Sequence, residues 1–122
     1  MDTNVDTAIM TREELLALHQ ELTDEACRLM EVKNHDYSGG RDTSDPFLNF
    51  TRVERLGITD TKTGFMVRMT DKISRLITFI HNGSFKTKDE ALKDTILDLI
   101  NYSILLYAYA QTEKTEKGDY TE

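Results

Sequence analysis

An uninterrupted apolar stretch at residues 87–111 most constrains what this chain can fold into. It contains no proline or glycine and opens with Thr87 and Glu90, whose spacing is that of a capping box at a helix start. Four polar residues recur within it at helical spacing and therefore share one face: Glu90, Asp94, Asp98 and Asn101. The last two lie among leucines and isoleucines, where a polar side chain needs a partner to offset its burial. We therefore expect a long helix with a functional polar face.

The spacing of apolar residues predicts three further helices. The first starts at a capping box, residues 11–14, and runs to about Val32, with Cys27 buried on its apolar stripe. A short helix follows Asp45-Pro46 and ends at Gly57, and another long one covers residues 62–81. No β alternation is present, so the sequence predicts an all-α fold of three long helices and one short helix. The domain organisation we expect is a flexible arm at 1–10, a single domain at 11–111 and a disordered polar tail at 112–122.

Composition limits the classes of function. The longest strongly apolar run, residues 103–110, is too short to span a bilayer. The first residues do not show the basic-then-apolar pattern of a leader, so we do not expect export. The single cysteine cannot form an internal disulfide, which favours the cytoplasm. A net charge of −7 argues against binding long nucleic acid, but not against binding one small nucleotide. One cysteine and three histidines give no zinc spacing, and no GxSxG motif supports a serine nucleophile.

A charged stripe on the 62–81 helix consists of Arg68, Asp71, Lys72 and Arg75. It can form an ion-pair network with the last helix, or it can bind an anion, because arginine forks suit phosphate oxygens. The acidic stripe of the last helix has three interpretations: a solvated face, an ion-pair partner, or a Mg²⁺ site, since Mg²⁺ takes one or two carboxylates plus water and substrate phosphate. If the two helices pair antiparallel, both stripes can face one cleft. Such a cleft would be a nucleotide site.

The glycine-containing segment at residues 33–46 is predicted to be a loop. Long structured loops are disproportionately functional, and Gly39-Gly40 lets backbone N–H groups approach an anion closely. No Walker motif is present. Tyr37 can stack on a base or pack the loop against the core, and Asn49 can contact a base edge or cap a neighbouring segment.

Four blocks, KNHDYSGG, DPFLNF, VRMTDKISRL and DTILDLINYSILL, resemble the phage and bacterial nucleotide-modification-associated domain family over roughly residues 28–110. A looser similarity is to the MazG-type all-α nucleoside triphosphate pyrophosphohydrolases, whose ExxE and ExxD motifs bind Mg²⁺. Here Asp98-Leu-Ile-Asn101 falls at the ExxD position, and Asp71-Lys-Ile-Ser falls near ExxE but lacks its second acid. The resemblance implies a MazG-like helical bundle completed by homo-oligomerisation, with Tyr102–Tyr109 as a possible interface.

These observations predict a phage-type, cytoplasmic nucleotide-binding protein that hydrolyses or processes a (deoxy)nucleoside phosphate with Mg²⁺. Asp71 and Asp98 are the candidate catalytic residues, and Asp94 and Asp98 are the candidate metal ligands. The alternative is a non-catalytic protein that sequesters a host immune signalling nucleotide, for instance a cyclic one. A third possibility is a helical adaptor whose charged stripes are internal ion pairs. The candidate nucleotide-binding residues are Lys33, Asp36, Tyr37, Gly39, Gly40, Arg41, Asn49, Arg68, Lys72, Arg75 and Asn101.

Overall fold

A computed structural model describes residues 9–37, 45–82 and 89–117 of the chain. Its helices are α2 (Arg12–Tyr37), α3 (Leu48–Arg55), α4 (Thr61–Asn82) and α5 (Asp89–Lys117). No strand occurs within these ranges, so the predicted all-α fold is confirmed. No helix in the described part of the chain is both long enough and apolar enough to cross a membrane.

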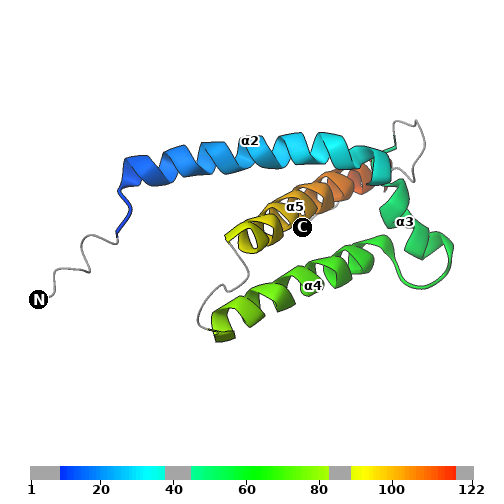
Figure 1. Ribbon diagram of the computed structural model, residues 1–122. Coiled ribbons are helices and arrows are strands. Elements are labelled where there is room, and N and C mark those ends of the chain that lie inside the picture. Colours follow the sequence, from blue (N-terminus) through cyan, green and yellow to red (C-terminus); the bar gives the residue numbers. More distant parts are fainter. Residues whose placement is uncertain (1–8, 38–44, 83–88, 118–122) are drawn as a thin grey trace, which may run out of the picture.

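The long helices form an open arrangement in which α5 lies between α2 and α4, with short α3 at one end (Figure 1). The pairing of α4 with α5 is antiparallel, as expected from their short connection. Lys62 at the start of α4 pairs with Glu113 late in α5, at 2.8 Å, whereas Lys72 further along α4 pairs with the earlier Asp98, at 3.0 Å. Among the described residues, no backbone contact joins α2 to α4. The helices therefore do not close into a complete bundle.

The start of α2 is the predicted capping box. The Thr11 N–H donates to Glu14 Oε1 at 2.9 Å, and the Glu14 N–H donates to Thr11 Oγ1 at 3.0 Å. The helix continues past Val32 to Tyr37, so the first residues of the predicted loop are helical. The corresponding Thr87–Glu90 box lies outside the described side chains, and α5 extends beyond Gln111 to Lys117.

The prediction that Cys27 is buried is wrong, because its side chain is exposed. The neighbouring Ala26 is the residue of this turn that packs against α5, with only 2% of its surface exposed. Successive helical residues are separated by about 100° around the axis, so Cys27 points away from α5.

The connection from α3 to α4 is built from local hydrogen bonds. Gly57 ends α3 with φ of 78°, a conformation that glycine adopts without the steric cost of a Cβ. Asp60 then caps α4, because its carboxylate accepts from the Thr63 N–H at 3.2 Å and from the Thr63 hydroxyl at 2.6 Å. The buried Thr61 donates both its N–H and its hydroxyl to Glu54 Oε1, at 3.0 and 2.8 Å. These contacts fix the angle between the two helices.

An aromatic cluster fills the core where α3, α4 and α5 meet. The rings of Phe50 and Phe65 stack with centroids 4.5 Å apart, and Phe65 is fully buried. Tyr102 packs edge-on against Phe50, and Tyr109 packs edge-on against Phe47. Two tyrosines of the stretch that was expected to supply an interface therefore belong to the core of the single chain.

Candidate functional site

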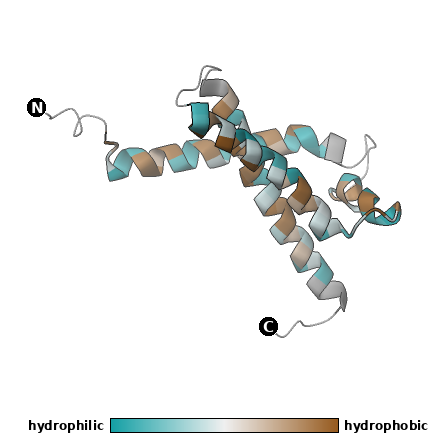
Figure 2. Cartoon of the chain, turned by 90° about the horizontal axis from the view of Figure 1, so that it is seen from below, coloured by the Kyte–Doolittle hydropathy of each residue, from teal (hydrophilic) through white to brown (hydrophobic). Residues whose placement is uncertain are grey.

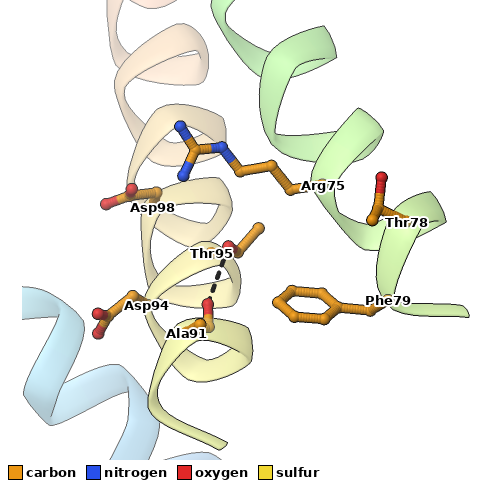
Figure 3. A pocket seen from close by; sticks show the side chains of 7 residues that line it. All are labelled: Arg75, Thr78, Phe79, Ala91, Asp94, Thr95 and Asp98. Carbon is orange, nitrogen blue, oxygen red and sulfur yellow. Dashed lines mark hydrogen bonds between the residues drawn. The ribbon is translucent and has the colours of Figure 1, made fainter. Parts of the chain in front are cut away.

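A cleft of about 400 Å³ lies between α4 and α5, as the sequence predicted for two antiparallel helices (Figure 3). Both charged stripes contribute to it, since Arg75 comes from α4 and Asp94 and Asp98 come from α5. Its remaining lining residues are Thr78 and Phe79 of α4 and Ala91 and Thr95 of α5. Its volume falls within the roughly 300–1,000 Å³ range of small-molecule sites.

The carboxylate of Asp98 on α5 forms ion pairs with residues of both other long helices. Lys33 of α2 places Nζ 3.2 Å from Asp98 Oδ1, and Lys72 of α4 places Nζ 3.0 Å from Asp98 Oδ2. Lys72 and Asp98 are largely shielded from water, with side chains 15% and 16% exposed. The two ammonium groups outnumber the one carboxylate that they share, and Asp98 is the member of this cluster that lines the cleft. The structure thus brings together three of the predicted site residues from three separate helices.

Arg75 adds a third cation. Its side chain extends from α4 toward α5, above Thr95 and near Asp98 (Figure 3). Its Nε also lies 3.5 Å from Asp71 Oδ2, but both side chains of this pair are well exposed. Exposed pairs of this kind contribute little stability, so Arg75 can reorient toward a ligand at low cost. Asp71 itself does not line the cleft.

The carboxylates in the cleft that could bind Mg²⁺ are those of Asp94 and Asp98, which lie one helical turn apart. Within the described residues, no group of three or more His, Cys, Asp or Glu side chains could hold a metal ion. Asp98 is already bound by two lysines, whereas the Asp94 carboxylate is exposed. A Mg²⁺ ion would fit here only if ligand phosphates and water supplied most of its oxygen ligands.

Three predicted site residues have structural contacts elsewhere. The Arg68 guanidinium lies 4.6 Å from the centroid of the Phe50 ring, a cation–π contact. Asn101 is 1% exposed, and its amide nitrogen donates to the Ala26 carbonyl at 3.0 Å, which joins α5 to α2. Asn49 Oδ1 accepts a hydrogen bond from Arg52 at 3.2 Å, within α3. None of the three lines the cleft between α4 and α5.

The glycine-containing segment contributes less to the described site than the sequence suggested. Asp36 and Tyr37 lie in the last turn of α2, where only their backbone is described. Gly39, Gly40 and Arg41 lie outside the described residues. Their assignment to the site stays a prediction.

Sequence reasoning missed the uncharged lining of the cleft. Thr78 and Phe79 follow Arg75 by three and four residues, so they share its side of α4. Ala91 and Thr95 precede Asp98 at similar spacing, and the Thr95 hydroxyl donates to the Ala91 carbonyl at 3.0 Å (Figure 3). These uncharged residues could have been predicted, because residues three, four or seven positions from a charged cleft residue lie on the same side of its helix.

The fold and the site define an all-α protein with a charged cleft between two antiparallel helices. Comparison with protein-family models, with curated proteins and with solved structures gives no match for this chain. The resemblance to the nucleotide-modification-associated domain family and to MazG-type enzymes therefore stays a prediction.

Proposed function

We propose that this protein binds a nucleotide through its phosphates in the cleft between α4 and α5. The observation that carries the proposal is that Asp98, on which Lys33 and Lys72 converge, lines the same cleft as Arg75. Cations held by packed helices are positioned before a ligand arrives, which reduces the entropy lost on binding. The guanidinium of Arg75 can bind two phosphate oxygens at once, and the lysines add point charges.

The uncharged lining suits the rest of a nucleotide. Phe79 offers an aromatic ring on which a base can stack, and Thr78 and Thr95 supply hydroxyl oxygens near it. The cleft is small, and the chain as a whole carries a net charge of −7. These two facts favour one small phosphorylated ligand over a long nucleic acid, which requires an extended basic surface.

A second candidate function is Mg²⁺-dependent hydrolysis of a (deoxy)nucleoside phosphate. The specific observation in its favour is that Asp94 and Asp98 line the same cleft as Arg75. Asp94 would be the main protein ligand of the ion, and a bound Mg²⁺ would polarise a phosphoryl oxygen. Asp71 lies off the cleft, so hydrolysis would depend on Asp94 and Asp98 alone. Without hydrolysis, the same cleft would serve to sequester a signalling nucleotide in the cytoplasm of a phage-infected bacterium, which the loss of acidic positions relative to the MazG-type motifs favours.

The test is isothermal titration of the protein with dNTPs, nucleoside monophosphates and cyclic di- and trinucleotides, in Mg²⁺ and in EDTA. The ligand is then recovered and analysed by chromatography. Binding in EDTA with the ligand recovered unchanged supports sequestration. Conversion that requires Mg²⁺ supports the hydrolase. No binding to any nucleotide in either condition contradicts the proposed function and favours a helical adaptor.

A further inference from the structure

The cleft between α4 and α5 has a charged end and an uncharged end. Arg75 of α4 and Asp98 of α5 line the charged end. Phe79 of α4 and Ala91 of α5 line the uncharged end (Figure 3). Hydrophilic and hydrophobic segments alternate along the helices (Figure 2), so this division belongs to the lining of the cleft and not to whole helices. A nucleotide with its phosphates at the charged end would place its base against Phe79.

Asp94 lies between these two ends. A helix rises about 1.5 Å per residue, so along the axis of α5 Asp94 is about 4.5 Å from Ala91 and about 6 Å from Asp98. On α4, Arg75 and Phe79 are also about 6 Å apart along the axis. Figure 3 shows the Asp94 carboxylate on the same side of α5 as the Asp98 carboxylate. Because the sugar of a nucleoside 5′-phosphate joins the base to the phosphate, a nucleotide in this orientation brings its sugar to the level of Asp94.

The carboxylate of Asp94 is available to a ligand. Its side chain is exposed, and no hydrogen bond or ion pair joins it to another residue in the described part of the chain. The ammonium group of Lys93, the preceding residue, pairs with Glu25 of α2 at 2.9 Å. The Asp98 carboxylate, in contrast, already binds two ammonium groups. An ionised carboxylate accepts hydrogen bonds at both oxygens and donates none, so Asp94 favours a ligand group that donates two hydrogen bonds.

The two threonine hydroxyl groups in the lining already donate their protons within the helices. Thr95 Oγ1 donates to the Ala91 carbonyl at 3.0 Å, and Thr78 Oγ1 donates to the Ser74 carbonyl at 3.2 Å. Each hydroxyl group has only one proton to donate. The side chains at the middle of the cleft therefore present hydrogen-bond acceptors to a ligand, and a sugar hydroxyl group can donate to an acceptor whereas a methylene group cannot.

We propose that Asp94 selects ribonucleotides over 2′-deoxyribonucleotides in this cleft, by accepting hydrogen bonds from the 2′- and 3′-hydroxyl groups of the ribose. Two neighbouring hydroxyl groups match the two oxygens of one carboxylate, and acidic side chains recognise the ribose 2′-hydroxyl group in this way in dinucleotide-binding folds. A 2′-deoxyribose lacks one of the two donors, so one Asp94 oxygen faces a methylene group. The inference rests on the proposed nucleotide binding and requires no Mg²⁺.

The charge of Asp94 makes the two sugars respond differently to its removal. Its negative charge repels phosphates that are bound near Arg75, whichever sugar the ligand carries. A ribonucleotide offsets this repulsion with two charge-assisted hydrogen bonds, and a 2′-deoxyribonucleotide offsets it with one at most. Because Asp94 is exposed, water competes for these hydrogen bonds, so we expect a preference of roughly tenfold and not the much larger ratios of buried sites.

The test is isothermal titration in EDTA with matched pairs of ribonucleoside and 2′-deoxyribonucleoside 5′-monophosphates that carry each of the common bases. We expect the native chain to bind a ribonucleotide roughly tenfold more tightly than its 2′-deoxy counterpart. A 3′-deoxyribonucleotide should lose a similar factor, because it also lacks one hydroxyl group of the pair. In Asp94→Ala, the ribonucleotide affinity should fall and the 2′-deoxyribonucleotide affinity should rise, until the two agree within about twofold.

Asp24→Asn on the exposed side of α2 is the matched control, because it changes the net charge by the same amount outside the cleft. It should leave the ratio of the two affinities unchanged. Circular dichroism checks that each variant is folded, and misfolding would lower both affinities instead of moving them in opposite directions.

Equal affinity of the native chain for the two sugars would overturn this inference and leave the proposed nucleotide binding intact. A preference that Asp94→Ala retains would also overturn it, and so would a preference that appears only when Mg²⁺ is present. Failure of every nucleotide to bind would contradict the proposed function and this inference together.

Discussion

The ammonium group of Lys72 lies 3.0 Å from Asp98 Oδ2, and this pair joins α4 to α5 at the wall of the candidate cleft. The other oxygen of the same carboxylate binds Lys33 of α2, at 3.2 Å. Asp98 thus has one structural role that is directly visible, as the common partner of two cations. Its proposed effect on ligand binding rests on the same geometry, because a phosphate would compete with the carboxylate for these ammonium groups.

Asp98→Asn should separate these two roles. Removing the shared partner of two lysines should lower the free energy of unfolding by about 1–3 kcal/mol. The same change should strengthen nucleotide binding in EDTA by roughly 2–10-fold, because a negative charge beside the phosphates is lost. Urea unfolding and isothermal titration measure the two effects, with Asp24→Asn on the exposed side of α2 as the control. Loss of binding in EDTA would show that Asp98 contacts the ligand by accepting hydrogen bonds.

Arg75 and Arg68 form a matched pair of cations on α4. Arg75→Gln should weaken nucleotide binding by roughly tenfold, since a charge-assisted hydrogen bond to phosphate is lost. Arg68→Gln should leave the affinity unchanged and lower the free energy of unfolding by about 0.5–1 kcal/mol, through its contact with Phe50. Titration and urea unfolding of both variants test this distinction. Equal loss of affinity in the two variants would contradict the assignment of the phosphates to the cleft between α4 and α5.

Asn101 is expected to act on stability alone. Its buried amide donates to the Ala26 carbonyl, so Asn101→Ala removes a link between α5 and α2 and leaves a small void. The free energy of unfolding should fall by about 1–3 kcal/mol, with nucleotide affinity unchanged under conditions where the variant is folded. If affinity falls while stability does not, Asn101 belongs to the binding site as the sequence suggested.

Much of the fold follows from residue patterns. The Thr11–Glu14 capping box, Gly57 at the end of α3 and the apolar stripe of α4 are local signals, and each marks its helix correctly. The extension of α2 through Lys33 to Tyr37 was missed, because the glycines that end the helical pattern come later than the polar residues that suggested a loop. Local patterns locate helices well and their ends less well.

The sequence predicts which charged residues share a helix face, but it does not predict which residues of other helices they contact. Periodicity places Asp98 and Asn101 on one face of α5, but it cannot distinguish a residue between helices from one that opens onto a cleft. The Asn101 amide donates a hydrogen bond to a backbone carbonyl of α2, and the Arg68 guanidinium lies over the Phe50 ring. Such contacts join residues far apart in the sequence, so only the packing of the helices reveals them.

Asp60 should make stability depend on pH at the start of α4. The Thr63 hydroxyl and then the Thr63 N–H donate to its carboxylate, which lowers the pKa of Asp60 from 3.8. A carboxyl with a lower pKa in the folded state stabilises it above the unfolded pKa, and this contribution is lost as the pH falls through the folded pKa. Asp60→Ala should therefore lower the Tm at neutral pH, and the difference should shrink below pH 3.8.

Asp60→Asn provides the control for this effect, because asparagine also caps helices but does not titrate. Its Tm relative to the native chain should rise as the pH falls below 3.8. Thermal unfolding of the three proteins by circular dichroism, across this pH range, makes the comparison. A difference between Asp60→Ala and the native protein that stays constant down to strongly acidic pH would contradict the role of the ionised cap.

The most direct test of the proposed function is a titration of the isotopically labelled protein with a nucleotide, followed by amide chemical shifts. The account predicts that the largest shifts fall on the two cleft walls, residues 75–79 of α4 and 91–98 of α5, with small changes along residues 12–22 of α2. Large shifts confined to other parts of the chain, or no shifts at saturating ligand, would contradict a nucleotide site between α4 and α5.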